Sequence, residues 1–482
     1  MQTKTIILIL LFLISLGSFS GSKKHSPKQA VHAVTDLSHE FTFYADNRFH
    51  AQYLPKQKAV TNWCNLWNFD FSNTNLLILP GCDDRIIYAD QDLETIQNFL
   101  NDGGGVVILG HSETKSQNEL LRNFGTEFNG KSQHPLSAKN EFADFKPEGK
   151  GGSVLKLEIP RKWKVIVHDA DNQPMMASRK VGKGTLLVAS RNLAGSNPNA
   201  SDSINKEIWK PLLIETALGK PVDPSKRLHG RGIEDLEHND NHGTFKLSYN
   251  DYMKPFAGAM VDVYKRTFPS IETRMGVPLS PGMASQITLL ATDGGGFSSG
   301  KVVALAVWWG GFPERDDSMI EFLTHESVHS WVLPYAEVWN EPIATYVGNL
   351  VMMDMGYAEE AQKRIQQTIA RASKLDPDMN LYDIDGSVSG SNGRELNNGE
   401  KNNIHWGKTY WIFEQLRKEN PDFIAEYFKL KRELATREKI TKYDMNNTVA
   451  LLSRVMGKDL FPWFNQHGII VDKKNAEIIS GY

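Results

Sequence analysis

Cysteine is scarce in this chain, and its positive and negative charges nearly cancel. Only Cys64 and Cys82 occur among 482 residues, which is too few for a disulfide framework or for a metal site built from cysteines. The two cysteines either pair with each other or remain as buried thiols, and the sequence allows both. With 54 Lys and Arg against 57 Asp and Glu, the formal net charge of -3 offers no basic field for nucleic acid.

Long hydrophobic runs are also missing beyond the first residues. Lys4 is followed by an apolar run from Ile6 to Leu16, broken only by Ser15, and then by small residues up to Ser22. This run is shorter than the roughly 20 apolar residues that a membrane-spanning helix needs. Its layout is that of a cleavable secretory signal. We therefore expect residues 1–22 to be a signal peptide, and the mature protein to be secreted or periplasmic without stable membrane insertion.

The length indicates two or three domains. Residues 23–40 are polar and are expected to form a loose lead-in. From 41 to 219, short apolar runs alternate with helical stretches, and the expected strands include Leu76–Leu79, Val106–Leu109 and Gly184–Ser190. Continuous apolar strands separated by helices predict a layered α/β domain, in which helices cover both faces of a parallel sheet.

Part of this first domain resembles class I glutamine amidotransferase-like domains. The resemblance rests on residues 75–112, which include Gly103-Gly104-Gly105, and on the turn Val181-Gly182-Lys183-Gly184 before a strand. Catalytic members carry a cysteine nucleophile after the strand that matches Val106–Leu109, but the chain here reads Gly110-His111-Ser112. The resemblance therefore implies an amidotransferase-like fold without its nucleophile, used for spacing or binding.

Residues 220–227 contain two prolines and several charges, and are expected to form a linker. A second domain is expected from 228 to 470. It contains a glycine- and serine-rich loop at 294–300 and a strand from Val302 to Trp309, and its pattern is largely helical after Ser318.

The strongest chemical signal is the pattern His-Glu-x-x-His at residues 325–329. On a helix, His325 and His329 lie one turn apart on the same face, so both imidazoles can reach one ion. Glu326 would hold the water that such an ion activates. A catalytic zinc site needs a third protein ligand. Glu341 is the candidate, because Asn340 is a favourable N-cap for a second helix that would start there.

These residues together resemble the gluzincin zinc metallopeptidases. The resemblance joins His-Glu-x-x-His to the later block Trp339-Asn-Glu-x-x-Ala-Thr-Tyr346, and it implies an α+β, mainly helical domain that uses Zn²⁺. Both aminopeptidase N-type and enhancin-like (mucin-degrading) enzymes belong to this group. The short connection between His329 and Glu341, and the absence of the glycine-rich exopeptidase segment, favour the enhancin-like type.

Catalysis would also need a donor for the oxyanion. The resemblance points to the helix around 403–413, where His405 and Tyr410 are the nearest candidates, although His405 could equally be a surface residue and Tyr410 a core residue. The strand Val302–Trp309 is expected to line the cleft, so that substrate backbone could add to its edge. Trp308 and Trp309 would stack on substrate or, more commonly, pack in the core.

The sequence thus favours a zinc endopeptidase that acts outside the cytoplasm on a protein or glycoprotein substrate. The alternative is a non-catalytic protein that binds a glycan or a cell surface and retains a vestigial metal site.

Overall fold

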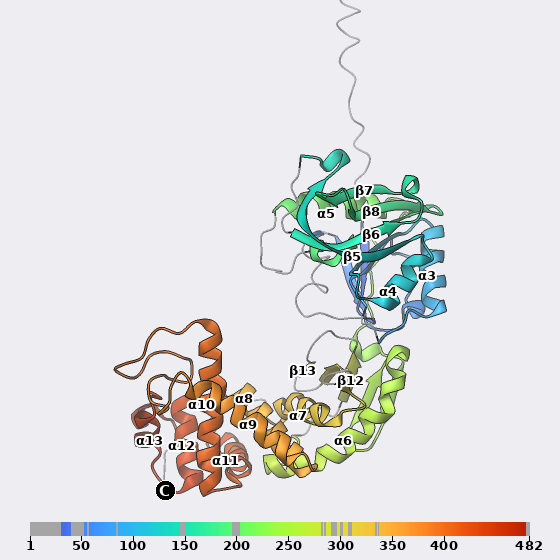
Figure 1. Cartoon of the computed structure of the whole chain (residues 1–482). Helices are drawn as coiled ribbons and strands as arrows, with labels where there is room; N and C mark the ends of the chain where they lie inside the picture. Colours follow the sequence, from blue (N-terminus) through green and yellow to red (C-terminus); the bar gives the residue numbers. More distant parts are fainter. Residues whose placement is uncertain are drawn as a thin grey trace, which may run out of the picture.

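The computed structural model describes residues 30–39, 53–54, 57–82, 85–144, 150–194, 203–280, 283, 286–290, 296–298, 302–306, 311–332, 335 and 337–478. A large mixed sheet dominates the N-terminal half, and the C-terminal half is mostly helical (Figure 1). The signal peptide expected at 1–22 lies outside the described residues, as do Trp308 and Trp309. Within those residues, every helix is too short or too polar to cross a bilayer.

Nine strands form the sheet of the N-terminal half, in the order β2-β1-β3-β4-β9-β8-β7-β5-β6. Their bounds are β1 (His32–Asp36), β2 (Lys58–Asn62), β3 (Leu76–Leu79), β4 (Gly105–Gly110), β5 (Thr126–Ala138), β6 (Lys150–Leu157), β7 (Lys164–Asp169), β8 (Pro174–Val181) and β9 (Gly184–Ser190). The strands expected at Leu76–Leu79, Val106–Leu109 and Gly184–Ser190 are confirmed.

The expectation of a parallel sheet holds for only part of this sheet. Strands β2, β1, β3, β4 and β9 run parallel, whereas β8, β7, β5 and β6 pair antiparallel. The reversal begins at the turn between β8 and β9, where Val181 pairs with Gly184 and Gly182 has a φ of 56°. A tight hairpin reverses the chain, and parallel strands need a long crossover, so the short connection dictates the antiparallel pairing.

Residues 32–36 are not a loose lead-in, and this expectation was wrong. They form β1, which is buried along its whole length between β2 and β3. Two polar groups of His32 are hydrogen-bonded to the segment before β3: the backbone N–H of His32 donates to Asn75 Oδ1 at 2.9 Å, and His32 Nδ1 donates to the carbonyl of Asn73 at 2.8 Å. Partnered polar groups can be buried at little cost, which explains why the sequence of β1 lacks an apolar signal.

Helices cover both faces of this sheet. On one face lie α3 (Asp90–Asn101) and α4 (Lys115–Arg122), and on the other lies α5 (Ser203–Ala217). Because side chains alternate along a strand, Val106 and Ile108 of β4 pack on the α3 side, and Val107 and Leu109 pack on the α5 side.

The predicted linker 220–227 is irregular coil held against the edge of the sheet. Lys58 Nζ donates to the carbonyls of Pro224 and Lys226 at 2.6 and 2.7 Å, and the N–H of Asp223 donates to Asn73 Oδ1 at 2.8 Å.

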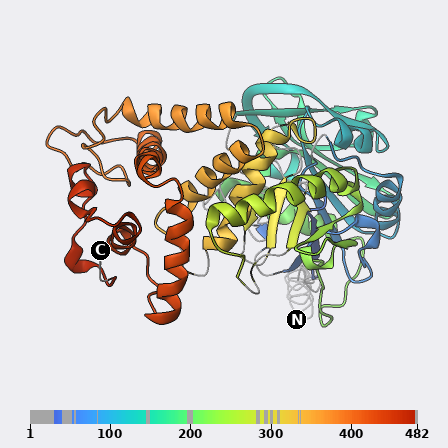
Figure 2. The same ribbon diagram turned by 90° about the horizontal axis from the view of Figure 1, so that it is seen from below.

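The second half contains a sheet of five strands, in the order β10-β11-β12-β14-β13. Its strands are β10 (His238–Asn241), β11 (Lys246–Tyr249), β12 (Gln286–Leu290), β13 (Gly296–Ser298) and β14 (Val302–Ala306). The helices are α6 (Lys254–Met275), α7 (Asp316–Val332), α8 (Asn340–Asp354), α9 (Ala358–Ser373), α10 (Asn398–Glu419), α11 (Phe423–Arg437), α12 (Met445–Met456) and α13 (Phe461–Gln466). Figure 2 shows the long yellow-green helix α6 crossing this small sheet, with the orange and red helices beyond it.

Candidate metal centre

Two neighbouring helices carry the residues of the His-Glu-x-x-His pattern and the acidic residue after it. Helix α7 ends at Val332, and α8 begins at Asn340. Glu341 therefore lies in the first turn of α8, as expected. Asn340 does not cap its own helix, contrary to the prediction. Its side chain instead contacts His329 of α7.

The side chains of His325, His329 and Glu341 converge. The Nε2 atoms of the two histidines lie 3.3 Å apart. Glu341 Oε2 lies 3.3 Å from Nε2 of His325, and Glu341 Oε1 lies 3.6 Å from Nε2 of His329. An ion with bonds of about 2.0–2.1 Å in tetrahedral geometry separates its ligand atoms by about 3.3–3.4 Å. The three donors thus have the spacing that one such ion requires.

Each histidine is oriented by a hydrogen bond at its other ring nitrogen. His325 Nδ1 lies 2.8 Å from Thr345 Oγ1, and His329 Nδ1 lies 3.2 Å from Asn340 Oδ1. When Nδ1–H donates to these oxygens, the Nε2 lone pairs face the convergence point, as metal-ligating histidines require. Thr345 could have been found from the sequence, because it follows Glu341 by four residues on α8 and so shares its helix face.

Glu326 is buried beside this point and forms a cluster with His325 and His329. Burial raises the pKa of Glu326 to about 7. The charge of His325 opposes this rise, and the negative charge of Glu341 adds to it. The pKa of Glu341 is instead held below its usual value, chiefly by the hydrogen bond from His325. The side chain of Glu341 is 56% exposed, so the site is open to solvent on that side.

The edge strand beside α7 is β13, not the expected Val302–Trp309 segment. Strand β14 lies inside the sheet, between β12 and β13. A side chain on Gly296 of β13 would come within 3.2 Å of Glu326 Cγ, and Ser298 Oγ lies 3.4 Å from Ser330 Oγ. Strand β13 therefore runs along α7 from Glu326 towards the C-terminal end of the helix. Glycine and serine are weak strand formers, so the sequence pattern of 294–300 indicated a loop.

The two candidate oxyanion donors lie in different surroundings. His405 is half-buried in the second turn of α10, its Nδ1 donates to the carbonyl of Ile384 at 3.2 Å, and its charge acts on Glu341. Tyr410 is 2% exposed and packs against Tyr346. Burial raises the pKa of Tyr410 well above its usual value. Its hydroxyl is already engaged by Thr345 and Asn349. His405 thus lies close enough for its charge to lower the pKa of Glu341, and Tyr410 belongs to the core.

No protein-family model and no curated protein matches the chain. Among solved structures, it is similar to the N-terminal domain of mmIFT52, with 14% identity over 41% of this chain and 100% of that chain, and a TM-score of 0.32. It is also similar to the exo-beta-1,4-mannosidase Op5Man5 from Opitutaceae bacterium strain TAV5, with 12% identity over 40% of this chain and 36% of that chain, and a TM-score of 0.27. Native leukotriene A4 hydrolase from Saccharomyces cerevisiae gives 12% identity over 42% of this chain and 36% of that chain, with a TM-score of 0.31. At these TM-scores the similarities carry no argument about fold or function.

Proposed function

We propose that this protein is a zinc-dependent peptidase in which His325, His329 and Glu341 hold the metal and Glu326 is the general base. The observation that carries the proposal is the convergence of three side chains: the two Nε2 atoms lie 3.3 Å apart, and one carboxylate oxygen of Glu341 lies 3.3 Å from His325 and the other 3.6 Å from His329. Two imidazoles and one carboxylate, with a fourth position open to solvent, make a donor set that suits catalytic zinc. Each histidine also has the supporting hydrogen bond that such sites use.

Zinc bound at this site would lower the pKa of a water and polarise the scissile carbonyl. Glu326 accepts the proton of the attacking water and then delivers it to the leaving amine. We assign His405 to stabilise the negative charge that develops on the carbonyl oxygen, because the hydroxyl of Tyr410 is already engaged.

The substrate would be an extended protein segment that lies along β13 and α7. Strand β13 pairs with β14 and runs beside α7 from Glu326 towards Ser330. The signal peptide expected at 1–22 places the substrates outside the cytoplasm, and glycoproteins are included in the proposal. The N-terminal half is proposed to be an amidotransferase-like domain that positions the peptidase or binds a partner.

The test compares wild type with Glu326→Gln on a broad peptide library, with zinc content measured for both proteins. We expect both to bind about one zinc per chain, and the variant to lose at least about 100-fold in kcat/KM, because the proton acceptor is gone. Glu359→Gln, an exposed change on α9, is the matched control. If wild type binds zinc but is as inactive as the variant, a non-catalytic binding protein becomes the better assignment. Absence of zinc would refute the metal site itself.

A further inference from the structure

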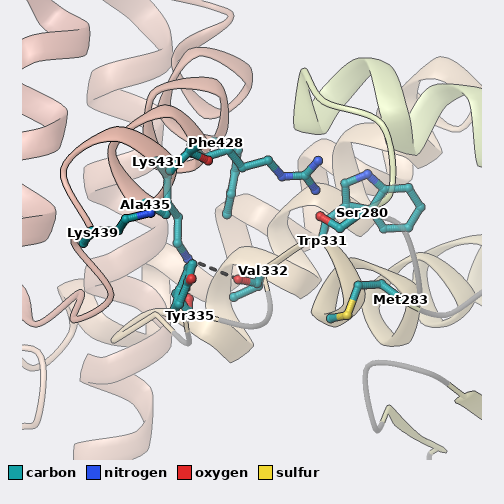
Figure 3. Close-up of a pocket in the computed structure, with 11 residues that line it drawn as sticks. Ser280, Met283, Trp331, Val332, Tyr335, Phe428, Lys431, Ala435 and Lys439 are labelled. Carbon is teal, nitrogen blue, oxygen red and sulfur yellow. Dashed lines mark hydrogen bonds between the residues drawn. The ribbon is translucent and has the colours of Figure 1, made fainter.

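A cavity of about 520 Å³ lies between the C-terminal end of α7 and helix α11. Figure 3 shows Val332 and Tyr335 on one side, and Phe428, Lys431 and Lys439 of the α11 region on the other. Arg432 also lines it. The cavity is thus part apolar and part basic, and the described residues that line it include no carboxylate.

This cavity continues the helix face that carries the metal ligands. Val332 follows His329 by three residues and His325 by seven, so the three side chains share one face of α7. With a rise of about 1.5 Å per residue, Val332 lies about 4.5 Å beyond His329 along the helix axis. Strand β13 follows the same direction, since Gly296 lies near Glu326 and Ser298 near Ser330. A peptide laid along β13 would therefore pass from the metal centre towards the cavity.

Among the three basic residues of the cavity, Lys431 has its charge balanced internally. Its Nζ lies 2.5 Å from Glu337 Oε1 and donates to the carbonyl of Val332 at 3.2 Å. It therefore has little attraction left for a ligand.

Arg432 is different, because part of its guanidinium is buried without a partner. One terminal nitrogen donates to the carbonyl of Pro278, whereas Nη2 is buried and has no hydrogen-bond partner among the described residues. Within that part of the chain, no carboxylate pairs with Arg432, and burial lowers its pKa. A buried donor without a partner is unfavourable, and more so when it is charged. An acceptor that enters the cavity would remove this cost. Lys439, exposed at the rim, adds a second positive charge.

We propose that this cavity is a substrate subsite for a carboxylate of the peptide, bound by Arg432 with Lys439 at the rim. The inference rests on the proposed peptidase function and adds a preference for acidic substrates. A guanidinium binds a carboxylate through charge-assisted hydrogen bonds, and Val332 and Phe428 offer an apolar surface to the methylene groups of the same side chain.

The experiment uses a peptide that the wild-type protein cleaves, with an amidated C-terminus. Each of the three positions on either side of the scissile bond is changed in turn to Glu or to Gln, and kcat/KM is measured for every pair. A further peptide with a free C-terminal carboxylate separates a terminal acid from an acidic side chain. The readout is the ratio of kcat/KM for the acidic peptide to that for its neutral partner.

We expect a ratio of at least about ten at one position in wild type, the usual scale of a charge-assisted hydrogen bond. The ratio should fall close to one in Arg432→Gln and to an intermediate value in Lys439→Gln. Lys439 is exposed, so its variant keeps the test valid if Arg432→Gln does not fold. The matched control is Arg437→Gln on the same helix, whose side chain is 74% exposed and pairs with Glu433, away from the cavity. Its ratio should equal that of wild type.

The subsite proposal would be wrong if the ratio is near one at every position in wild type. It would also be wrong if the ratio is unchanged in both Arg432→Gln and Lys439→Gln. This failure is distinct from failure of the peptidase proposal, in which no peptide is cleaved. In that case, the subsite is tested by measuring how labelled Glu-containing and Gln-containing peptide pools bind to the Glu326→Gln protein. The site is supported if this protein prefers the acidic pool and if adding either Arg432→Gln or Lys439→Gln weakens that preference. Equal binding of both pools rejects the site.

Discussion

The hydroxyl of Tyr252 donates a 2.6 Å hydrogen bond to Asp92 Oδ1, and this bond joins the segment leading into α6 to helix α3 of the N-terminal half. The other oxygen of Asp92 lies 3.3 Å from His39 Nε2, and His39 Nδ1 lies 2.9 Å from Asp36 Oδ2. The imidazole is fully buried and stacks on Tyr88 at 4.0 Å. A buried imidazole between two buried carboxylates therefore lies where the two halves of the chain meet.

Replacing His39 should destabilise the whole chain. In His39→Gln, the carboxylates of Asp36 and Asp92 remain buried without a balancing charge, which typically costs 3–5 kcal/mol. We expect a loss of about that size in the free energy of unfolding, measured with urea. His134→Gln, which breaks an exposed pair with Asp171, is the control and should cost no more than about 1 kcal/mol. A loss in His39→Gln as small as that of the control would show that the network does not stabilise the fold.

The same histidine should make stability depend on pH. Burial alone lowers the pKa of His39, but the carboxylates of Asp92 and Asp36 outweigh it and raise the pKa to about 9. The folded-state pKa of His39 lies above its unfolded value of 6.5. Protonated His39 therefore stabilises the fold fully below pH 6.5, and this stabilisation is lost as the pH rises through 9. Burial and Asp92 raise the pKa of Tyr252 well above its usual value, so it stays neutral in this window.

Unfolding free energies of wild type should therefore fall by on the order of 3 kcal/mol between pH 6.5 and 9. His39→Gln removes the titrating group, so the free energy of unfolding of this variant should change less with pH over that range. Parallel curves for the two proteins would assign the pH dependence to another group.

The two cysteines should remain free thiols. Both are buried, and Cys64 Sγ donates to the carbonyl of Asp235 at 3.1 Å, while Cys82 Sγ lies 3.1 Å from Ser116 Oγ. Burial, with a further effect from Glu237, raises the pKa of Cys64 to about 12, which suppresses the reactive thiolate. A thiol reagent should label no cysteine in the folded protein and two after denaturation. Detection of a disulfide by mass spectrometry would contradict this arrangement.

The sequence predicted the convergence of His325, His329 and Glu341 better than it predicted the sheets. Helix periodicity brings His325 and His329 to one face of α7, and the helix start predicted at Asn340 puts Glu341 in the first turn of α8. The packing of α8 against α7 then brings Glu341 to the two histidines. Strand β13 was missed because glycine and serine carry no strand signal, and its pairing with β14 decides its conformation.

Strand β1 was missed for a related reason. The residues His-Ala-Val-Thr-Asp at 32–36 are as polar as a loop, and their burial depends on Asn73 and Asn75, some forty residues away. Hydrogen bonds between distant segments leave no local pattern, so this strand could be recognised only in the folded chain.

Thr345 should control metal affinity although it is not a ligand. Its hydroxyl lies 2.8 Å from His325 Nδ1 and fixes the orientation of the ring. Loss of such a supporting contact typically weakens metal binding 10- to 100-fold. We expect that decrease in zinc affinity for Thr345→Val, measured by competition with a chromogenic chelator. Thr267→Val is the control, because Thr267 is buried in α6 and its hydroxyl donates to the carbonyl of Tyr264 in the same helix. Equal affinities for both variants would mean that Thr345 does not orient the ligand.

The buried pair of Lys431 and Glu337 should stabilise the segment that leaves α7. Lys431 Nζ lies 2.5 Å from Glu337 Oε1 and donates to the carbonyl of Tyr335 at 2.5 Å, while Tyr427 donates to Glu337 Oε2 at 2.8 Å. Lys431→Met leaves an unpaired buried carboxylate, so we expect a loss of about 3–5 kcal/mol in urea unfolding.

Adding Glu337→Gln to Lys431→Met removes that charge and should restore part of the loss, because the remaining amide can still accept from Tyr427. Lys429→Met, an exposed change on the same helix, should stay within about 0.5 kcal/mol of wild type. The decisive comparison is the coupling between the two changes in a double-mutant cycle. If their effects simply add, Lys431 acts through its carbonyl contacts at the end of α7, and the ion pair contributes nothing of its own.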